Sequence, residues 1–131
     1  MPLAHRQKVP QILCLAQSSR NLSPMLREVK TSGFEVTMAF TADQGVAVCV
    51  ANQVAAVLLD AAFIRNDDWT VARSLKMVKL GVPILLLDCR ARSRGKGLPP
   101  GIDAVASPGD PKKVLAELKR CLAAIGALKR R

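Results

Sequence analysis

The sequence predicts an α/β domain in which helices cover both faces of a parallel sheet. Short apolar runs alternate with amphipathic stretches along most of the 131 residues, which is the pattern of repeated strand–helix units. Residues 54–60 are apolar almost throughout, as expected of a strand buried on both faces of its sheet. Half of the residues are hydrophobic and only 3% are aromatic, so the core is expected to be aliphatic.

Five apolar runs are predicted as strands, at residues 11–16, 34–40, 54–60, 82–88 and 102–106. Helices are predicted at residues 23–33, 41–52, 69–80 and 110–128. The first helix is expected to start at Ser23 and Pro24, a capping residue followed by a proline in the first turn. Thr41 with Gln44 three residues later fits a capping box at the start of the second.

Residues 90–101 interrupt the alternation. This stretch contains two adjacent prolines and several glycines, and it shows no apolar periodicity, which argues against a full helix. We therefore expect an exposed basic loop between the fourth and fifth strands. With right-handed crossovers, the remaining elements form a doubly wound five-stranded parallel sheet.

Positive charge is concentrated in the last third of the chain. Residues 1–89 carry nine basic and seven acidic side chains, a net charge of +2, whereas residues 90–131 carry eleven and three, a net charge of +8. Such a distribution favours an acidic partner. No aromatic residues are interleaved with the basic stretch to stack bases, so specific nucleic-acid binding is not expected.

The four cysteines do not indicate a metal site. They form no C-x-x-C pair, and the single histidine, His5, lies near the N-terminus, so we expect neither a metal ion nor a cofactor. No apolar stretch is long enough for a signal peptide or a membrane-spanning helix, which predicts a cytoplasmic protein without membrane contact.

Four segments resemble receiver domains of bacterial response regulators in order and spacing. The motif ILCLA resembles their first strand, VLLD the strand that ends in the phosphoacceptor aspartate, VPILLLD their fourth strand, and ASPGDP the lysine–proline step before the last helix. The resemblance covers residues 10–125. It implies a flavodoxin-like, receiver-like topology with strand order 2-1-3-4-5, here with the fourth helix shortened or absent.

The resemblance places Asp60 at the phosphoacceptor position, but the other positions differ. Ala16 and Gln17 stand where receivers carry the acidic pair that holds Mg²⁺. Asp88 replaces the threonine or serine that ends strand four, and Ser107 replaces the lysine. Mg²⁺ prefers hard oxygen ligands that include carboxylates, and forming an acyl phosphate needs cations and aimed donors. We therefore expect a degenerate pocket that does not depend on phosphorylation.

The two aspartates allow more than one interpretation. In the order 2-1-3-4-5, Asp60 and Asp88 end neighbouring strands, so one could raise the pKa of the other. They could also bind a cation in a rearranged site. Alternatively, each could pair with an arginine, such as Arg65 or Arg90.

A different class of function remains open. Cys14 and Arg20 have the C-x₅-R spacing of the phosphate loop in low-molecular-weight tyrosine phosphatases, and Asp110-Pro111 resembles their general-acid loop. That chemistry would use Cys14 as nucleophile, Arg20 as oxyanion clamp and Asp110 as acid. However, residues 15–19 contain no glycine to bring backbone amides around a phosphate.

The favoured prediction is a stand-alone, non-catalytic receiver-like module of two-component phosphorelay signalling that acts through protein contacts. Its domain is expected at residues 10–128, between a leader at 1–9 and a basic tail at 129–131. An acidic protein partner is expected to bind the basic loop, through Arg90, Arg92, Arg94 and Lys96.

Overall fold

The apolar runs form one parallel sheet in the computed structural model, which describes residues 9–90 and 97–124. The strands are β1 (Gln11–Leu15), β2 (Glu35–Ala39), β3 (Val54–Asp60), β4 (Ile84–Leu87) and β5 (Ala104–Ala106). Their order is β2-β1-β3-β4-β5, and every neighbouring pair is parallel. The predicted fold class and strand order are therefore confirmed.

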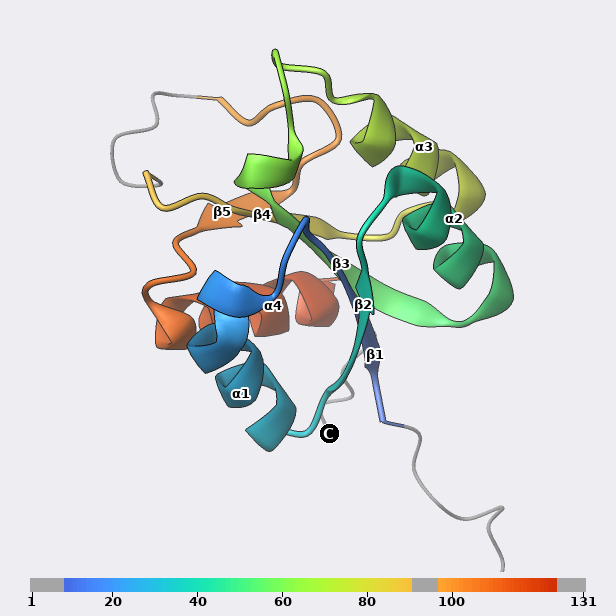
Figure 1. Ribbon diagram of the computed structural model, residues 1–131. Helices are drawn as coiled ribbons and strands as arrows, with labels where there is room; N and C mark the ends of the chain where they lie inside the picture. The colour runs from blue at the N-terminus through green and yellow to red at the C-terminus, as the bar shows by residue number, and fades with distance from the viewer. Residues whose placement is uncertain (1–8, 91–96, 125–131) are drawn as a thin grey trace, which may run out of the picture.

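Helices cover both faces of this sheet (Figure 1). They are α1 (Ser23–Thr31), α2 (Ala42–Ala51), α3 (Thr70–Val78) and α4 (Pro111–Ala124). α1 and α4 pack on one face, and α2 and α3 pack on the other. Two short 3₁₀ turns, η2 (Arg20–Leu22) and η3 (Ala61–Phe63), follow β1 and β3.

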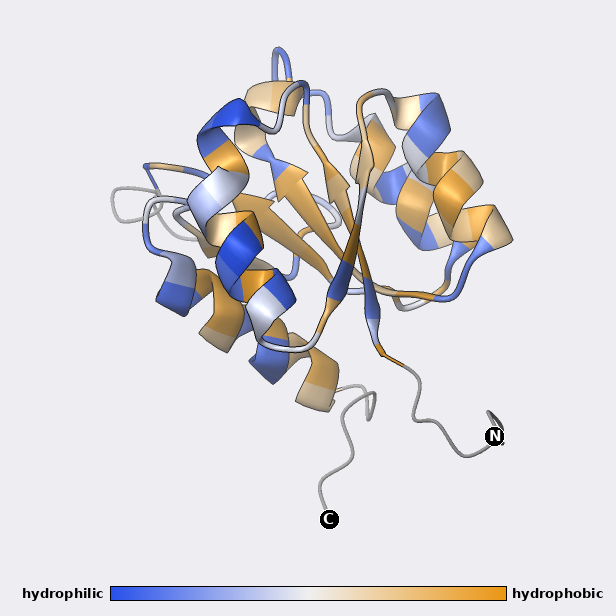
Figure 2. Cartoon of the chain, turned by 60° about the horizontal axis from the view of Figure 1, so that its bottom comes forward, coloured by the Kyte–Doolittle hydropathy of each residue, from blue (hydrophilic) through white to orange (hydrophobic). Residues whose placement is uncertain are grey.

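Alternate residues of each central strand belong to two different cores, because successive side chains point to opposite faces of a sheet. Leu58 of β3 packs under α1 and α4, whereas its neighbours Val57 and Leu59 pack under α2 and α3. Both faces of β3 are thus buried, as its composition predicted. Figure 2 shows the resulting layer of apolar strands between the helices.

Several predicted boundaries are wrong by one or two residues. β4 begins at Ile84 and β5 at Ala104, each two residues later than predicted. α1 has Leu22 as its N-cap, because the η2 turn leads directly into the helix, and the Ser23 hydroxyl donates a hydrogen bond back to the carbonyl of Ser19. α3 ends at Val78, two residues earlier than predicted.

The predicted cap of α2 forms, although only half of the capping box is present. The Thr41 hydroxyl accepts the Gln44 N–H at 3.1 Å. The Gln44 carboxamide instead accepts the N–H of Phe40 at 2.8 Å, one residue before the expected position. Both bonds satisfy donors at the entrance to the helix.

No helix occurs between β4 and β5 in residues 97–103, a stretch that includes residues 97–101 of the predicted basic loop. The chain here is held against α3. Gly101 has a φ of +82°, and a Cβ at this position would lie 3.0 Å from the Cβ of Ala72. Asp103 pairs with Lys76 at 2.6 Å and accepts the Ile84 N–H at 2.8 Å.

Three of the four residues predicted to bind a partner, Arg92, Arg94 and Lys96, lie outside the described residues. The end predicted for the last helix, near residue 128, lies outside them as well. Within the described part of the chain, no helix is long and apolar enough to cross a membrane.

Candidate functional site

The carboxyl ends of the strands bring together four residues that the resemblance assigns to the pocket, Ala16, Asp60, Asp88 and Ser107. Asp60 ends β3 opposite Leu87 of β4, so Asp88 follows directly beside it. The N–H of Asp88 donates to the carbonyl of Ala106 at 3.0 Å, which places Ser107 next along the edge. On the other side of β3, Ala16 follows the end of β1.

Asp60 is a half-buried carboxylate at the start of η3. Its Oδ1 accepts the N–H of Ala62 at 3.3 Å, a local cap that fixes the side chain at the strand end. Burial raises the pKa of Asp60, the Ala62 N–H bond opposes this, and the negative charge of Asp88 adds to the increase. The predicted electrostatic coupling between the two aspartates is therefore present.

Asp88 is only 3% exposed and is the one polar or charged side chain counted as buried within the described residues. Its Oδ1 accepts the Arg90 N–H at 2.9 Å and lies 3.6 Å from the Arg90 Nε. A buried carboxylate is tolerated when it is paired and hydrogen-bonded. The geometry thus supports the predicted pairing of Asp88 with Arg90, alongside the electrostatic influence of Asp88 on Asp60.

The residues that flank Asp60 do not fit a magnesium ion. Ala16 is fully buried and offers only a methyl group, Gln17 is exposed, and Asp88 is already engaged by Arg90. Mg²⁺ needs near-octahedral oxygen ligands. Over residues 9–90 and 97–124, no three histidine, cysteine, aspartate or glutamate side chains gather closely enough to hold a metal ion.

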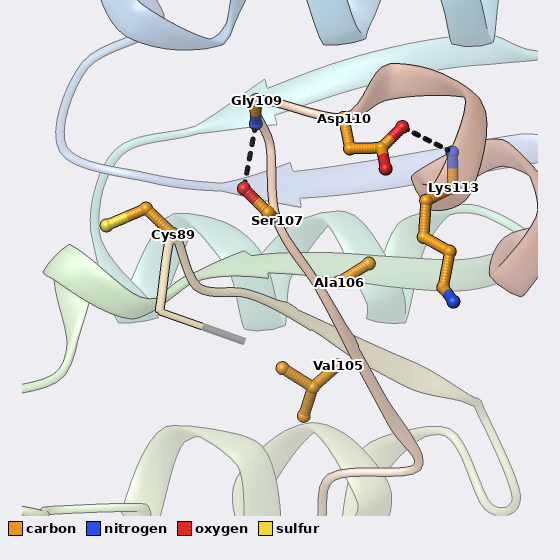
Figure 3. A pocket seen from close by; sticks show the side chains of 7 residues that line it. All are labelled: Cys89, Val105, Ala106, Ser107, Gly109, Asp110 and Lys113. Carbon is orange, nitrogen blue, oxygen red and sulfur yellow. Dashed lines mark hydrogen bonds between the residues drawn. The ribbon is translucent and has the colours of Figure 1, made fainter. Parts of the chain in front are cut away.

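A pocket of about 660 Å³ opens beside Ser107, at the end of β5 and the start of α4. Its described lining residues are Cys89, Val105, Ala106, Ser107, Gly109, Asp110 and Lys113 (Figure 3). The Ser107 hydroxyl accepts the Gly109 N–H at 3.1 Å, and Asp110 accepts the Lys113 N–H at 3.3 Å. These bonds shape the turn that leads into α4.

Sequence reasoning selected Ser107 but missed Cys89 and Lys113 as lining residues of the same pocket. In Figure 3, the Cys89 and Ser107 side chains point to one side of the strand end, and Lys113 extends on the other. Nothing in the sequence signals this arrangement, because it depends on how the loop after β4 meets the loop after β5.

The phosphatase interpretation does not agree with the geometry. Cys14 lies inside β1, one residue before its end, and is fully buried. Burial, together with the charge of Asp60, raises the pKa of Cys14 to about 12, whereas a nucleophilic cysteine needs a lowered pKa and access to substrate. Arg20 is exposed in η2.

No protein-family model matches the chain, and no curated protein sequence matches it significantly. Solved structures do match. A response regulator from Desulfuromonas acetoxidans has a TM-score of 0.74 at 19% identity, with 88% of this chain and 98% of that chain covered. A signal receiver domain of an HD domain-containing protein from Pseudomonas fluorescens has a TM-score of 0.73 at 17% identity, covering 97% and 96%.

A third similar structure is a CheY-like response regulator receiver domain protein from Methanospirillum hungatei. Its TM-score is 0.72 at 18% identity, and 89% of this chain and 96% of that chain are covered. Each alignment thus spans nearly the whole length of the matched chain. At these identities the likeness concerns the fold, and the chain has the receiver-like α/β fold.

Proposed function

We propose that this protein is a non-catalytic receiver-like module of two-component signalling that works through protein contacts and without phosphorylation of Asp60. The observation that carries the proposal is the state of Asp88. This carboxylate is buried next to Asp60, at the strand end where the resemblance implies a hydroxyl, and it is held by Arg90.

The chemistry of phosphoryl transfer supports the proposal. The transferred group needs cations and preorganised donors to stabilise its charge. A second carboxylate beside Asp60 repels that charge, and the residues at the magnesium positions offer no carboxylate. Loss of a single preorganised donor typically lowers a rate by about 100–1000-fold, and here several are replaced together.

We expect no stable phosphorylation of Asp60 by acetyl phosphate and Mg²⁺. Intact-mass spectrometry should show no adduct of about 80 Da, the mass of one phosphoryl group. An active receiver domain treated in parallel is the positive control, and Asp60→Asn is the matched variant. An adduct on the wild-type protein that disappears in Asp60→Asn would contradict the proposal.

The proposed partner is an acidic protein that binds the basic region formed by α4 and the loop after β4. Lys113 and Lys119 are exposed on α4, and neither takes part in an ion pair with another described residue. A twofold interface through this region would place each patch against its own copy, so the like charges oppose a symmetric dimer. The same charges speed the encounter with an acidic partner at low salt.

Reversing Arg92 and Arg94 to glutamate should weaken capture of that partner about tenfold and flatten its dependence on salt, because each long-range charge contributes to attraction. The measurement is quantitative crosslinking in extract from the source cells at several salt concentrations, with and without acetyl phosphate. Arg73→Glu with Lys79→Glu changes the net charge equally, but at α3 and the residue that follows it. The proposal is contradicted if the two double variants weaken capture of the partner equally, or if capture depends on the presence of acetyl phosphate.

A further inference from the structure

β2 forms an open edge of the sheet. In the strand order it has β1 as its single neighbour. The N–H of Glu35 donates to the carbonyl of Pro10, and the carbonyl of Ala39 accepts the N–H of Ala16. The residues at both ends of β2 therefore turn their backbone groups toward β1.

Successive residues of a strand turn their backbone groups to alternate sides. Because Glu35 and Ala39 face β1, Val36 and Met38 turn both N–H and C=O toward the open edge. Unpaired groups of this kind are a template for another extended chain. Natural edges are commonly protected by charged side chains, yet Glu35, at one end, is the single charged residue of β2.

A groove of about 470 Å³ runs beside this edge, between α1 and β2. Leu26 and Met38 contribute apolar surface to it, and Arg27 and Lys30 contribute positive charge. Both cations are exposed, and neither forms an ion pair with any residue of 9–90 or 97–124.

The orientation of α1 explains why these two charges belong to the groove. Glu28, on another side of the helix, pairs with Lys112 of α4 at 3.6 Å. Arg27 and Lys30 instead line the groove together with Met38 of β2. The groove is thus positive and partly apolar, and it lies next to unpaired backbone groups.

We propose that the edge of β2 binds an extended acidic segment of a partner protein as a sixth strand. Backbone groups of the segment pair with Val36 and Met38. Alternate side chains of the segment face α1, where acidic ones contact Arg27 and Lys30 and an apolar one covers Met38. The lining of this site includes neither Asp60 nor any described residue of α4, so the proposal does not depend on the proposed signalling role.

The test uses a blocked, fluorescein-labelled heptapeptide in which glutamate, valine and glutamate alternate with threonines. Fluorescence anisotropy should show saturable binding to the full chain, and a peptide with lysine in place of glutamate should bind at least tenfold more weakly. Saturable binding of a thymidine 20-mer with none of the peptide would overturn the proposal in favour of a nucleic acid.

Backbone methylation separates strand addition from attraction between side chains. One peptide carries N-methyl groups on the glutamate and valine amides, and a second carries them on the intervening threonines. Because only one alternate set of amides can face β2, we expect one methylated peptide to lose binding at least tenfold and the other to keep it. Equal binding of both, or equal loss in both, would rule out a sixth strand.

Charge reversal on the protein tests the groove itself. Arg27→Glu with Lys30→Glu should weaken peptide binding at least tenfold. Arg73→Glu with Lys79→Glu, at α3 and its C-cap, should stay within about threefold of the wild type, since remote surface charges act weakly. Equal losses in the two variants would overturn the location. If the α1 variant fails to fold, the methylated peptides still decide the question on the wild-type chain.

Discussion

Replacing Leu58 by alanine should lower the free energy of unfolding by about 3 kcal/mol, within the usual range of about 2–5 kcal/mol for a buried leucine. Leu58 is 0% exposed in the middle of β3, between Cys14 of β1 and Leu85 of β4. Neighbours on both sides are fixed in the sheet, so the space left by the side chain cannot close. Urea unfolding followed by circular dichroism measures the loss.

Leu80→Ala is the matched control, because the same atoms are removed from a side chain that is 88% exposed. Its effect should stay within about 0.5 kcal/mol, as for most surface substitutions. If the two variants lose similar stability, the assignment of Leu58 to the core and Leu80 to the surface is wrong.

The second large effect is expected at Gly101. A Cβ here meets the Ala72 Cβ at 3.0 Å and its carbonyl carbon at 3.5 Å, and the φ of +82° disfavours an L-residue. Gly101→Ala therefore combines about 1–2 kcal/mol of backbone strain with about 1–3 kcal/mol of overpacking. Thermal and urea unfolding should show a total loss of roughly 2–5 kcal/mol.

Gly81→Ala isolates the backbone part of this effect. Gly81 has a φ of +78°, but nothing lies within 4 Å of a Cβ at that position. We expect this variant to lose about 1–2 kcal/mol. A loss at Gly101 no larger than that at Gly81 would show that residues 97–103 do not pack closely on α3.

Sequence patterns were sufficient for the sheet because burial imposes them directly. A strand with helices on both faces must be apolar throughout, and β3 was predicted with its observed bounds. The start of β5 was predicted less well. Asp103 precedes the strand and uses its side chain to accept the Ile84 N–H while pairing with Lys76, and no local pattern signals contacts with residues so distant in sequence.

The candidate site, too, was predicted only in part from the sequence. The proximity of Asp60 and Asp88 followed from strand order, and the Asp88–Arg90 contact is local enough to have been named in advance. The pocket at Cys89 and Lys113 and the groove beside β2 were not predicted. Each is formed where segments from different parts of the chain meet, so its shape depends on packing that composition and periodicity do not encode.

One of the four cysteine thiols is accessible to thiol-reactive reagents in the native protein. Cys14, Cys49 and Cys121 are buried, and burial raises the pKa of each, so an electrophile finds neither access nor thiolate there. Cys89 alone is exposed. One equivalent of a thiol-reactive dye should therefore react with the folded chain at Cys89, which lines the β5–α4 pocket. Reaction of further equivalents then reports the fraction of molecules in which unfolding has exposed the three buried cysteines.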